Sequence, residues 1–396
     1  MNVVVAPDKF RGSLSAPQAA EAMSRGVRAA DSFATIDLAP MADGGEGTVE
    51  ALVVATQGEY RFVRVTGPLG QPVDARFGIL GDGQTAVIEM AAASGLALIP
   101  VEKRDPGLTT SRGTGELILA AIDAGVRRII LGIGGSATND GGVGCAQALG
   151  YRFLDRNGSE IGPGGKALES LDRIDASACH PIAQASGLPI RIDVACDVDN
   201  PLCGERGASV VYGPQKGASP DLIVQLDRNL ARLASCIERD LGRSVADLPG
   251  AGAAGGLGAG LVAFAGATLQ RGVDLVIDSV RLRNRLASAD LCLTGEGAID
   301  GSSAFGKTAV GVARLARSLG CPTLALAGTI GVGAEDVLPE GILAYFSLCP
   351  GPVTLEQAQK DAESFLARAT EQAVRCFLAG VSSGLRPDSF ERADHD

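Results

Sequence analysis

Short glycine-rich segments that carry a carboxylate recur in this chain, each after a β-type run and before a helix-like pattern. These turns cover residues 43–48, 132–142 and 294–300, and they follow the runs at 35–40, 128–131 and 290–293. Repeated strand, turn and helix units predict an α/β fold with parallel strands. Glycine lets backbone N–H groups approach an anion, and carboxylates suit a hard cation such as Mg²⁺. The pattern therefore predicts phosphate chemistry with a metal ion.

The α/β pattern is clearest at the two ends of the chain. Near the start, Ser15 and Gln18 have the spacing of a capping box before a helix that runs to about Ala30. In the middle, alternating runs at 60–65, 73–80 and 85–90 indicate a mixed or antiparallel sheet. A long amphipathic helix is predicted over 220–241.

This organisation predicts two α/β domains. Residues 1–65 and 285–380 would form a Rossmann-like parallel sheet, residues 66–284 an inserted mixed α/β domain, and residues 381–396 a polar tail. Ligands of open α/β sheets bind at the carboxyl ends of the strands, so we expect a site in a cleft between the domains.

Composition excludes several functional classes. A net charge of −11 argues against a general nucleic-acid binder. No apolar run approaches the roughly 20 residues that span a bilayer, and the chain opens on a strand-like run, so we expect a cytoplasmic protein without membrane contact. The 9 cysteines include no Cys-x-x-Cys pair, and with only 2 histidines general-base work falls to Asp, Glu or Lys.

Two glycine motifs match known patterns but have imperfect context. Gly301–Thr308 fits the P-loop pattern, yet the predicted turn at 294–300 separates it from its strand. Lys307, at the start of the next predicted helix, remains a candidate for a phosphate contact. Gly250–Gly255 fits a dinucleotide fingerprint, but no convincing strand precedes it. A flexible helix entry that faces the substrate is the better interpretation.

Three acidic turns carry stronger signals. Gly132–Gly142 combines glycines, two hydroxyls and Asn139-Asp140, although a tight structural turn with a capping residue is the alternative. Asp43–Glu46 has the same arrangement, with an Asp cap as its alternative. Asp197–Asn200 offers two carboxylates and an amide at a strand end.

Two loops carry cations. Lys9 and Arg11 lie in Asp8–Ser13, which fits either an anionic substrate or a solvated charged loop. Arg112 lies in the hydroxyl-rich segment 109–114 and could clamp a carboxylate or phosphate, although Ser/Thr capping explains the hydroxyls equally well.

Together these segments resemble bacterial glycerate kinases of the glyoxylate-pathway type. The matching segments, in order, are APDKFRGSLSA, PMADGGEGTVEAL, EMAAASGLALIP, TTSRGTGELI, GIGGSATNDGGVG, DVDNPLCGERGAS, GPQKGAS, GAGAAGGLGAGL and TGEGAIDGSSAFGK. The resemblance spans nearly the whole chain. It implies a flavodoxin-like domain from both termini with an inserted domain, and ATP-dependent phosphorylation of D-glycerate with Mg²⁺, giving 2-phosphoglycerate.

The resemblance also implies that the P-loop match is accidental. The family often has Ser and Lys where this chain has Lys9 and Arg11, and Gln-Thr where it has Ser302-Ser303. Two alternatives to this reaction stay open: a product phosphorylated at O3, and another small hydroxy acid as substrate. Whether the protein is a monomer or a homodimer also stays open.

On this basis we assign roles to individual residues. Catalysis is assigned to Asp43, Asp140, Lys9, Arg11 and Lys307; nucleotide binding to Gly134, Gly135, Ser136, Thr138, Gly295 and Glu296; substrate binding to Asp8, Ser13, Arg112 and Asn200; and metal binding to Asp43, Asp140 and Asp197. The residues leave open which carboxylate is the base and which binds metal. Competing classes are an NAD(P)-binding oxidoreductase that uses Gly250–Gly255 and a non-catalytic nucleotide-binding module.

Overall fold

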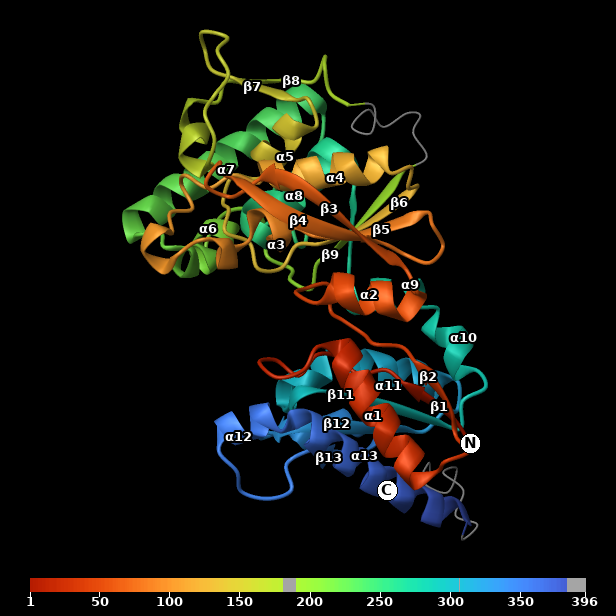
Figure 1. Cartoon of the computed structure of the whole chain (residues 1–396). Coiled ribbons are helices and arrows are strands. Elements are labelled where there is room, and N and C mark those ends of the chain that lie inside the picture. The colour runs from red at the N-terminus through yellow and green to blue at the C-terminus, as the bar shows by residue number, and fades with distance from the viewer. Residues whose placement is uncertain (181–189, 306, 383–396) are drawn as a thin grey trace, which may run out of the picture. The chain divides into compact units, whose positions relative to one another are not determined.

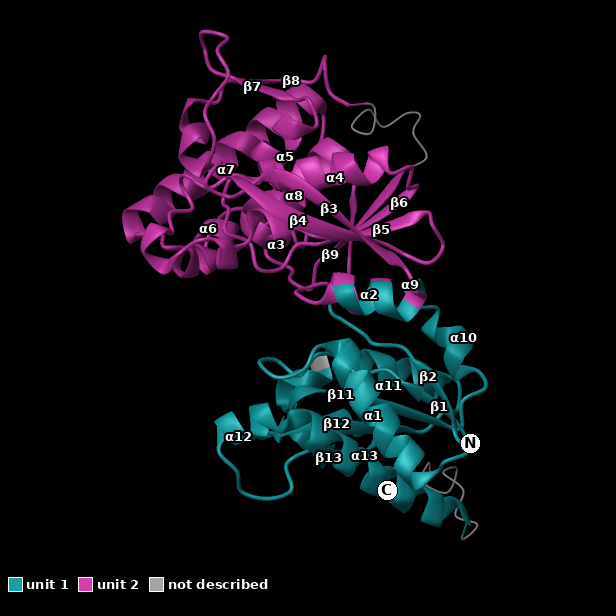
Figure 2. Ribbon diagram, in the orientation of Figure 1, with its two compact units in different colours: residues 1–43, 50–55, 276–396 teal, residues 44–49, 56–275 magenta. Residues whose placement is uncertain are grey.

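The structure is a computed structural model that describes residues 1–180, 190–305 and 307–382. The chain forms two compact units, coloured separately in Figure 2. Unit 1 comprises residues 1–43, 50–55 and 276–396, and unit 2 comprises residues 44–49 and 56–275. The boundaries differ from the predicted ones at 65 and 285, because the strand over 59–66 pairs within the sheet of unit 2.

Unit 1 is built on a five-stranded parallel sheet (Figure 1). Its strands are β1 (Asn2–Val5), β2 (Thr35–Leu38), β11 (Leu291–Ile299), β12 (Thr323–Ile330) and β13 (Ile342–Ser347). They lie in the order β13-β12-β11-β1-β2, and all neighbours pair in parallel. This is the flavodoxin-type order, in which the strand sequence reverses between β1 and β11.

Helices and short helical turns connect these strands. They are α1 (Ala16–Ala30), α10 (Leu282–Leu286), η6 (Gly301–Phe305), α11 (Thr308–Ser318), η7 (Ala334–Val337), α12 (Leu355–Lys360) and α13 (Ala362–Ser382). Helix α1 packs along α13. The predicted capping box is confirmed, since the backbone N–H of Ser15 donates to Gln18 at 2.9 Å. The core of this unit gathers apolar side chains of β1, β11, β12, α1 and α13.

Unit 2 contains the predicted mixed sheet. Its six strands lie in the order β10 (Thr268–Gln270), β9 (Arg191–Ala195), β6 (Arg128–Gly132), β5 (Thr85–Glu89), β4 (Pro72–Ile79) and β3 (Glu59–Thr66). The first four strands are parallel, and β4 pairs antiparallel with both β5 and β3. A separate antiparallel pair joins β7 (Arg152–Leu154) and β8 (Arg173–Asp175).

The helices of unit 2 surround a separate apolar core. They are α3 (Ala91–Ser94), η1 (Leu96–Leu98), η2 (Val101–Lys103), α4 (Arg112–Asp123), α5 (Val143–Ala148), η3 (Gly165–Ser170), α6 (Ala208–Tyr212), η5 (Pro214–Lys216), α7 (Pro220–Leu241) and α8 (Ala253–Ala265). The bounds predicted for α7 are confirmed. The chain passes between the units after residue 43, within α2 (Thr48–Thr56) and within α9 (Gly272–Ser279).

One predicted turn is wrong. Residues 294–299 continue strand β11, where Gly295 pairs with Leu326 and Glu296 with Ala327 of β12. A Cβ at position 295 would lie 2.3 Å from the Leu326 carbonyl oxygen, so glycine serves close strand pairing here. Glycine disfavours strands, so the glycines at 295 and 297 predict a turn from the sequence alone.

No helix within 1–180, 190–305 and 307–382 combines the length and apolar character needed to cross a lipid bilayer. Most of the predicted polar tail, residues 383–396, lies outside the described residues.

Candidate active site

In unit 1, predicted site residues gather where the strand order reverses. The loop after β1 carries Asp8 and Lys9, and β11 carries Glu296 beside them. The Asp8 N–H donates to the Gly295 carbonyl at 2.8 Å, which fixes this loop against β11. Ligands of doubly wound sheets bind at this reversal point, outside the carboxyl ends of the strands. The fold therefore places these side chains where such sheets carry their sites.

Asp8 is a buried carboxylate held by two hydrogen bonds. Its Oδ2 accepts from the Thr308 hydroxyl at 2.6 Å, and its Oδ1 accepts from the Lys9 N–H at 2.6 Å. Burial raises the pKa of Asp8, and the nearby Asp43 raises it further, against the lowering effect of Thr308. These bonds orient Asp8 and tie the loop after β1 to the start of α11.

Glu296 has a different environment. Its side chain is largely buried, and its Oε1 makes no hydrogen bond to any described residue. Burial raises the pKa of Glu296 to about 7, opposed by the charge of Lys307 and assisted by Asp8, Asp300 and Asp43. A carboxyl group with this pKa can accept a proton near neutral pH.

The cations of unit 1 lie beside these carboxylates. Lys9 Nζ lies 3.7 Å from Asp43 Oδ1, and Lys307 Nζ lies 3.7 Å from Asp300 Oδ1. All four side chains remain at least a quarter exposed, so the pairs are loose and the lysines can exchange partners. Arg11 is exposed. Ser13, in contrast, donates its hydroxyl to the Phe10 carbonyl at 3.0 Å, a local bond within the loop.

In unit 2, the turn after β6 is organised by Asp140. Its Oδ2 accepts from the Ser111 N–H at 2.8 Å, the Ser111 hydroxyl at 2.9 Å and the Gly144 N–H at 3.2 Å. Its Oδ1 accepts from the Gly142 N–H at 3.1 Å. Burial raises the Asp140 pKa against these bonds. Oδ2 thus anchors the turn to Ser111 at the start of α4, and Oδ1 holds the turn itself through Gly142.

Ser136, on the same turn, contacts a residue that sequence reasoning missed. Lys216, at the end of η5, is 2% exposed, and its Nζ donates to the Ser136 Oγ and the Thr138 carbonyl, each at 2.7 Å. Burial lowers the Lys216 pKa to about 7, and Asp140 opposes that shift. The segment GPQKGAS shows neither a periodic charge pattern nor a periodic hydrophobic pattern, so the sequence gives no signal that Lys216 is buried.

The other predicted residues of unit 2 have local partners. Arg112 Nε donates to Glu116 Oε1 at 3.1 Å within α4. Asn200 donates to the Arg206 carbonyl at 2.8 Å and accepts from the Tyr212 hydroxyl at 2.7 Å. Asp197 Oδ1 accepts from the N–H of the first residue of α9 at 2.9 Å. Their functional roles stay predictions, and these bonds give each a structural role.

Comparison with known proteins adds to this geometry. The family model described as "Glycerate kinase family" matches residues 3–378. The chain is 52% identical over 381 residues to a glycerate kinase of Halalkalibacterium halodurans, covering 96% of this chain and 98% of that protein. The chain belongs to the glycerate kinase family.

Two further relatives agree with this assignment. The glycerate 2-kinase of Escherichia coli is 49% identical, with 96% of this chain and 99% of that protein covered. A solved crystal structure of a protein from Salmonella typhimurium LT2 superimposes with a TM-score of 0.88 at 48% identity, covering 96% of this chain and 99% of that one. The resemblance stated from the sequence is confirmed, the fold class is confirmed, and this family member is an enzyme.

The two glycine motifs that match known patterns, Gly301–Thr308 and Gly250–Gly255, have structural contexts that differ from those patterns. Because β11 continues to Ile299, only Asp300 separates the strand from Gly301, so the expected gap before the P-loop match is wrong. Residues 301–305 form a 3₁₀ turn, and the Thr308 hydroxyl is bonded to Asp8. No strand lies between the end of α7 at Leu241 and the glycines of Gly250–Gly255, and Gly255 has a left-handed φ of +69°. This geometry differs from a dinucleotide-binding strand–turn–helix.

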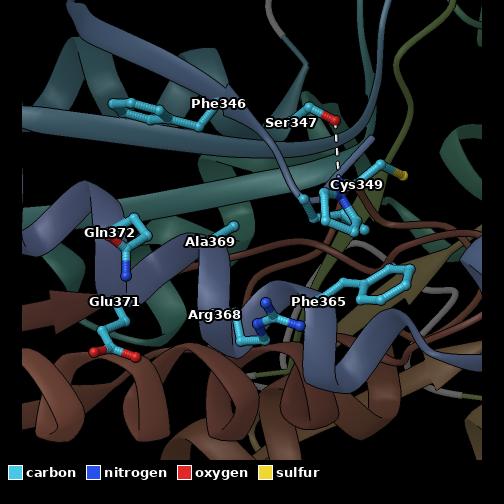
Figure 3. A pocket seen from close by; sticks show the side chains of 10 residues that line it. Phe346, Ser347, Cys349, Phe365, Arg368, Ala369, Glu371 and Gln372 are labelled. Carbon is cyan, nitrogen blue, oxygen red and sulfur yellow. Dashed lines mark hydrogen bonds between the residues drawn. The ribbon is translucent and has the colours of Figure 1, made fainter. Parts of the chain in front are cut away.

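A hollow elsewhere in unit 1 has a volume of about 340 Å³ (Figure 3). It lies between the end of β13 and α13, and its lining residues are Phe346, Ser347, Leu348, Cys349, Pro350, Phe365, Arg368, Ala369, Glu371 and Gln372. The Cys349 N–H donates to the Ser347 hydroxyl at 3.1 Å. None of the predicted site residues lines this hollow.

Proposed function

We propose that this enzyme transfers the γ-phosphoryl group of ATP to the C2 hydroxyl of D-glycerate, giving 2-phosphoglycerate and ADP. Membership of the glycerate kinase family supports the substrate and the reaction class. The name of the Escherichia coli relative, glycerate 2-kinase, supports the position of the phosphate. The largely buried Glu296, at the reversal point of the sheet, is the observation that carries the mechanism.

Glu296 is the proposed base. Phosphoryl transfer needs positioning, charge neutralisation and a group that accepts the proton of the attacking hydroxyl. Glu296 Oε1 has no hydrogen-bond donor among the described residues, and its pKa is raised to about 7, so it suits that proton. This proposal moves the role of base from Asp43 and Asp140, because Asp140 uses both oxygens to anchor its turn.

The cations of unit 1 would bind anionic oxygens. The charge of Lys307 acts on Glu296 and that of Lys9 on Asp8, and Arg11 is exposed in the same loop as Lys9. We assign these cations to the carboxylate of glycerate and to the transferred phosphoryl group. We keep the assignment of the turn at Gly134–Ser136 to the nucleotide phosphates. The expected cleft between the domains, the oligomeric state and the cytoplasmic location stay predictions.

The carboxylates of unit 1 also fit a magnesium ion. Among the described residues no group of three or more His, Cys, Asp or Glu side chains is arranged to hold a metal. Mg²⁺, however, is usually bound by one or two carboxylates together with substrate phosphates. Asp43, whose side chain is 50% exposed, has the hard oxygen donors and the access for this role. When bound, Mg²⁺ neutralises charge on the phosphates.

We expect Asp43→Asn to raise the Mg²⁺ concentration that gives half-maximal activity by about tenfold, because the change removes one charged ligand. Titration of initial rate against Mg²⁺ at saturating ATP measures this. The matched control is Asp74→Asn, which changes an exposed carboxylate on β4 and should leave the Mg²⁺ curve unchanged. A wild-type Mg²⁺ curve for Asp43→Asn would remove Asp43 from the metal site.

The proposed reaction is tested by ADP release from ATP and Mg²⁺ with D-glycerate. We expect release that depends on D-glycerate. Thermal-shift measurements with NAD(P) and with ATP–Mg²⁺ accompany this assay. Stabilisation by NAD(P) alone would favour an oxidoreductase, and stabilisation by ATP without ADP release across small hydroxy acids would favour a nucleotide-binding module.

A further inference from the structure

Lys216 is a buried cation that the proposed mechanism does not use. It lies at the end of η5 with 2% of its surface exposed. Buried lysines are rare unless they are paired with a charge, because desolvation of an ammonium is costly. Here its hydrogen-bond acceptors are the uncharged Ser136 hydroxyl and Thr138 carbonyl, each at 2.7 Å. The arrangement thus places a buried cation at the turn after β6, where its hydrogen-bond acceptors are uncharged and Asp140 acts on it through charge alone.

The bond to Ser136 fixes the direction of that hydroxyl. In its protonated form Lys216 can only donate hydrogen bonds, so the Ser136 Oγ then accepts from Lys216 Nζ, at 2.7 Å. The hydroxyl proton of Ser136 is then left for a different acceptor. An anionic oxygen is the strongest acceptor available to such a donor, particularly next to a positive charge.

The same turn carries further unsatisfied polar atoms. Thr138 Oγ1 and Asn139 Oδ1 are buried and make no hydrogen bond to any described residue. Buried polar atoms are rarely left without a partner, so each such atom requires an explanation. A bound polar molecule at this turn supplies one. This observation is independent of Lys216 and points to a ligand at the same turn.

We infer that Lys216 is a positioning residue for the nucleotide, whose ammonium turns the Ser136 hydroxyl so that its proton is donated to a phosphate oxygen of ATP. This inference rests on the proposed assignment of the turn at Gly134–Ser136 to nucleotide phosphates. Lys216 acts through Ser136 because its own side chain is buried.

Two single variants test the inference by steady-state kinetics. Ser136→Ala removes the donor, and Lys216→Met removes the group that orients it while keeping a long apolar chain. In Lys216→Met no ammonium fixes the direction of the Ser136 hydroxyl proton. We expect each variant to raise the KM for ATP about tenfold, the size of one hydrogen bond to a charged group. The KM for D-glycerate should stay within about twofold.

The double variant separates positioning from folding. If Lys216 acts through Ser136, the double variant should have the same KM for ATP as Ser136→Ala alone. Independent roles would multiply the two effects to about a hundredfold. The matched control is Thr109→Val, which removes a buried hydroxyl bonded to the Ala137 carbonyl of the same turn at 2.9 Å. Thr109→Val should lower Tm and keep the KM for ATP within about twofold, because it leaves the bond between Lys216 and Ser136 in place.

Ser136→Ala keeps Lys216 in place and decides the inference even where Lys216→Met does not fold. Its stabilisation by ADP in a thermal-shift assay should be smaller than that of the wild type. If Ser136→Ala has the KM for ATP of the wild type, or raises only the KM for D-glycerate, the inference is overturned. The proposed function still stands in that case, provided that the wild-type enzyme releases ADP with D-glycerate. Failure of wild-type ADP release would instead overturn the proposed function.

Discussion

Replacing Glu296 by glutamine is expected to lower kcat for D-glycerate phosphorylation by about 10²- to 10⁴-fold, the usual contribution of a positioned general base. The same change should raise Tm at pH 8. Glutamine keeps the shape of the side chain but removes a carboxylate whose charged form is disfavoured by burial beside Asp8, Asp43 and Asp300. A variant that is more stable and far less active is the signature of a group held in place for chemistry.

The pH dependence follows from the raised pKa of Glu296, which lies at about 7 against a usual 4.5. The base must be unprotonated, so wild-type kcat/KM should fall about tenfold per pH unit below 7, and the variant should lack this fall. For stability, the unfolded chain loses this proton near pH 4.5 and the folded chain near pH 7. Folding is therefore penalised progressively as pH rises between these values, and the Tm gain of Glu296→Gln should be larger at pH 8 than at pH 5.

Glu340→Gln is the matched control for this experiment. Glu340 also lies in unit 1, but its pKa is lowered by the hydrogen bond from Arg314, at 2.6 Å. Glutamine should therefore leave kcat unchanged and should not raise Tm. Near-normal turnover in Glu296→Gln, with an unchanged pH profile, would remove Glu296 from the mechanism.

Asp140→Asn is expected to destabilise the protein strongly, lowering Tm by roughly 5 to 15 °C. Asp140 Oδ2 accepts three hydrogen bonds and Oδ1 accepts one. In asparagine one of these oxygens is replaced by an NH₂ group, which would face hydrogen-bond donors instead of accepting from them. The loss corresponds to about 2–5 kcal/mol, the cost of breaking a buried network around a charge. Turnover should fall together with stability, because the turn that carries Ser136 loses its anchor to Ser111.

Thermal melts of the variant, monitored by circular dichroism, measure this effect. The kinetic assay is then run well below the variant's Tm, so that loss of folded enzyme is separated from loss of chemistry. A collapse of turnover with a wild-type Tm would contradict the anchoring role and would return Asp140 to the chemistry, as the sequence first suggested.

The sequence was sufficient to predict the fold class because periodicity and turn chemistry are local. The capping box at Ser15 and the helix over Pro220–Leu241 are examples, since both are set by residues close together in the chain. The continuation of β11 through Gly295 could not be predicted, because it depends on close pairing with Leu326 of a strand later in the chain. Local propensity is overridden there by tertiary contacts.

In the candidate site, too, the sequence predicts some features and not others. The acidic and basic residues of the turns could be found from their types, and Asp8, Lys9 and Glu296 do come together in unit 1. Their roles could not be predicted, because a role depends on burial and partners. Asp140 and Glu296 are both acidic residues near glycines, yet one is saturated with hydrogen bonds and the other has a buried oxygen without a donor among the described residues. Lys216 was missed for the same reason.

The proposed reaction is tested most directly by ³¹P NMR of the product formed from ATP, Mg²⁺ and D-glycerate. Phosphate on O2 couples to the lone C2 proton and gives a doublet, whereas phosphate on O3 couples to the methylene protons and gives a triplet. We predict a doublet that appears together with ADP and only in the presence of D-glycerate. A triplet, or ADP formation that does not depend on D-glycerate, would contradict the proposed function.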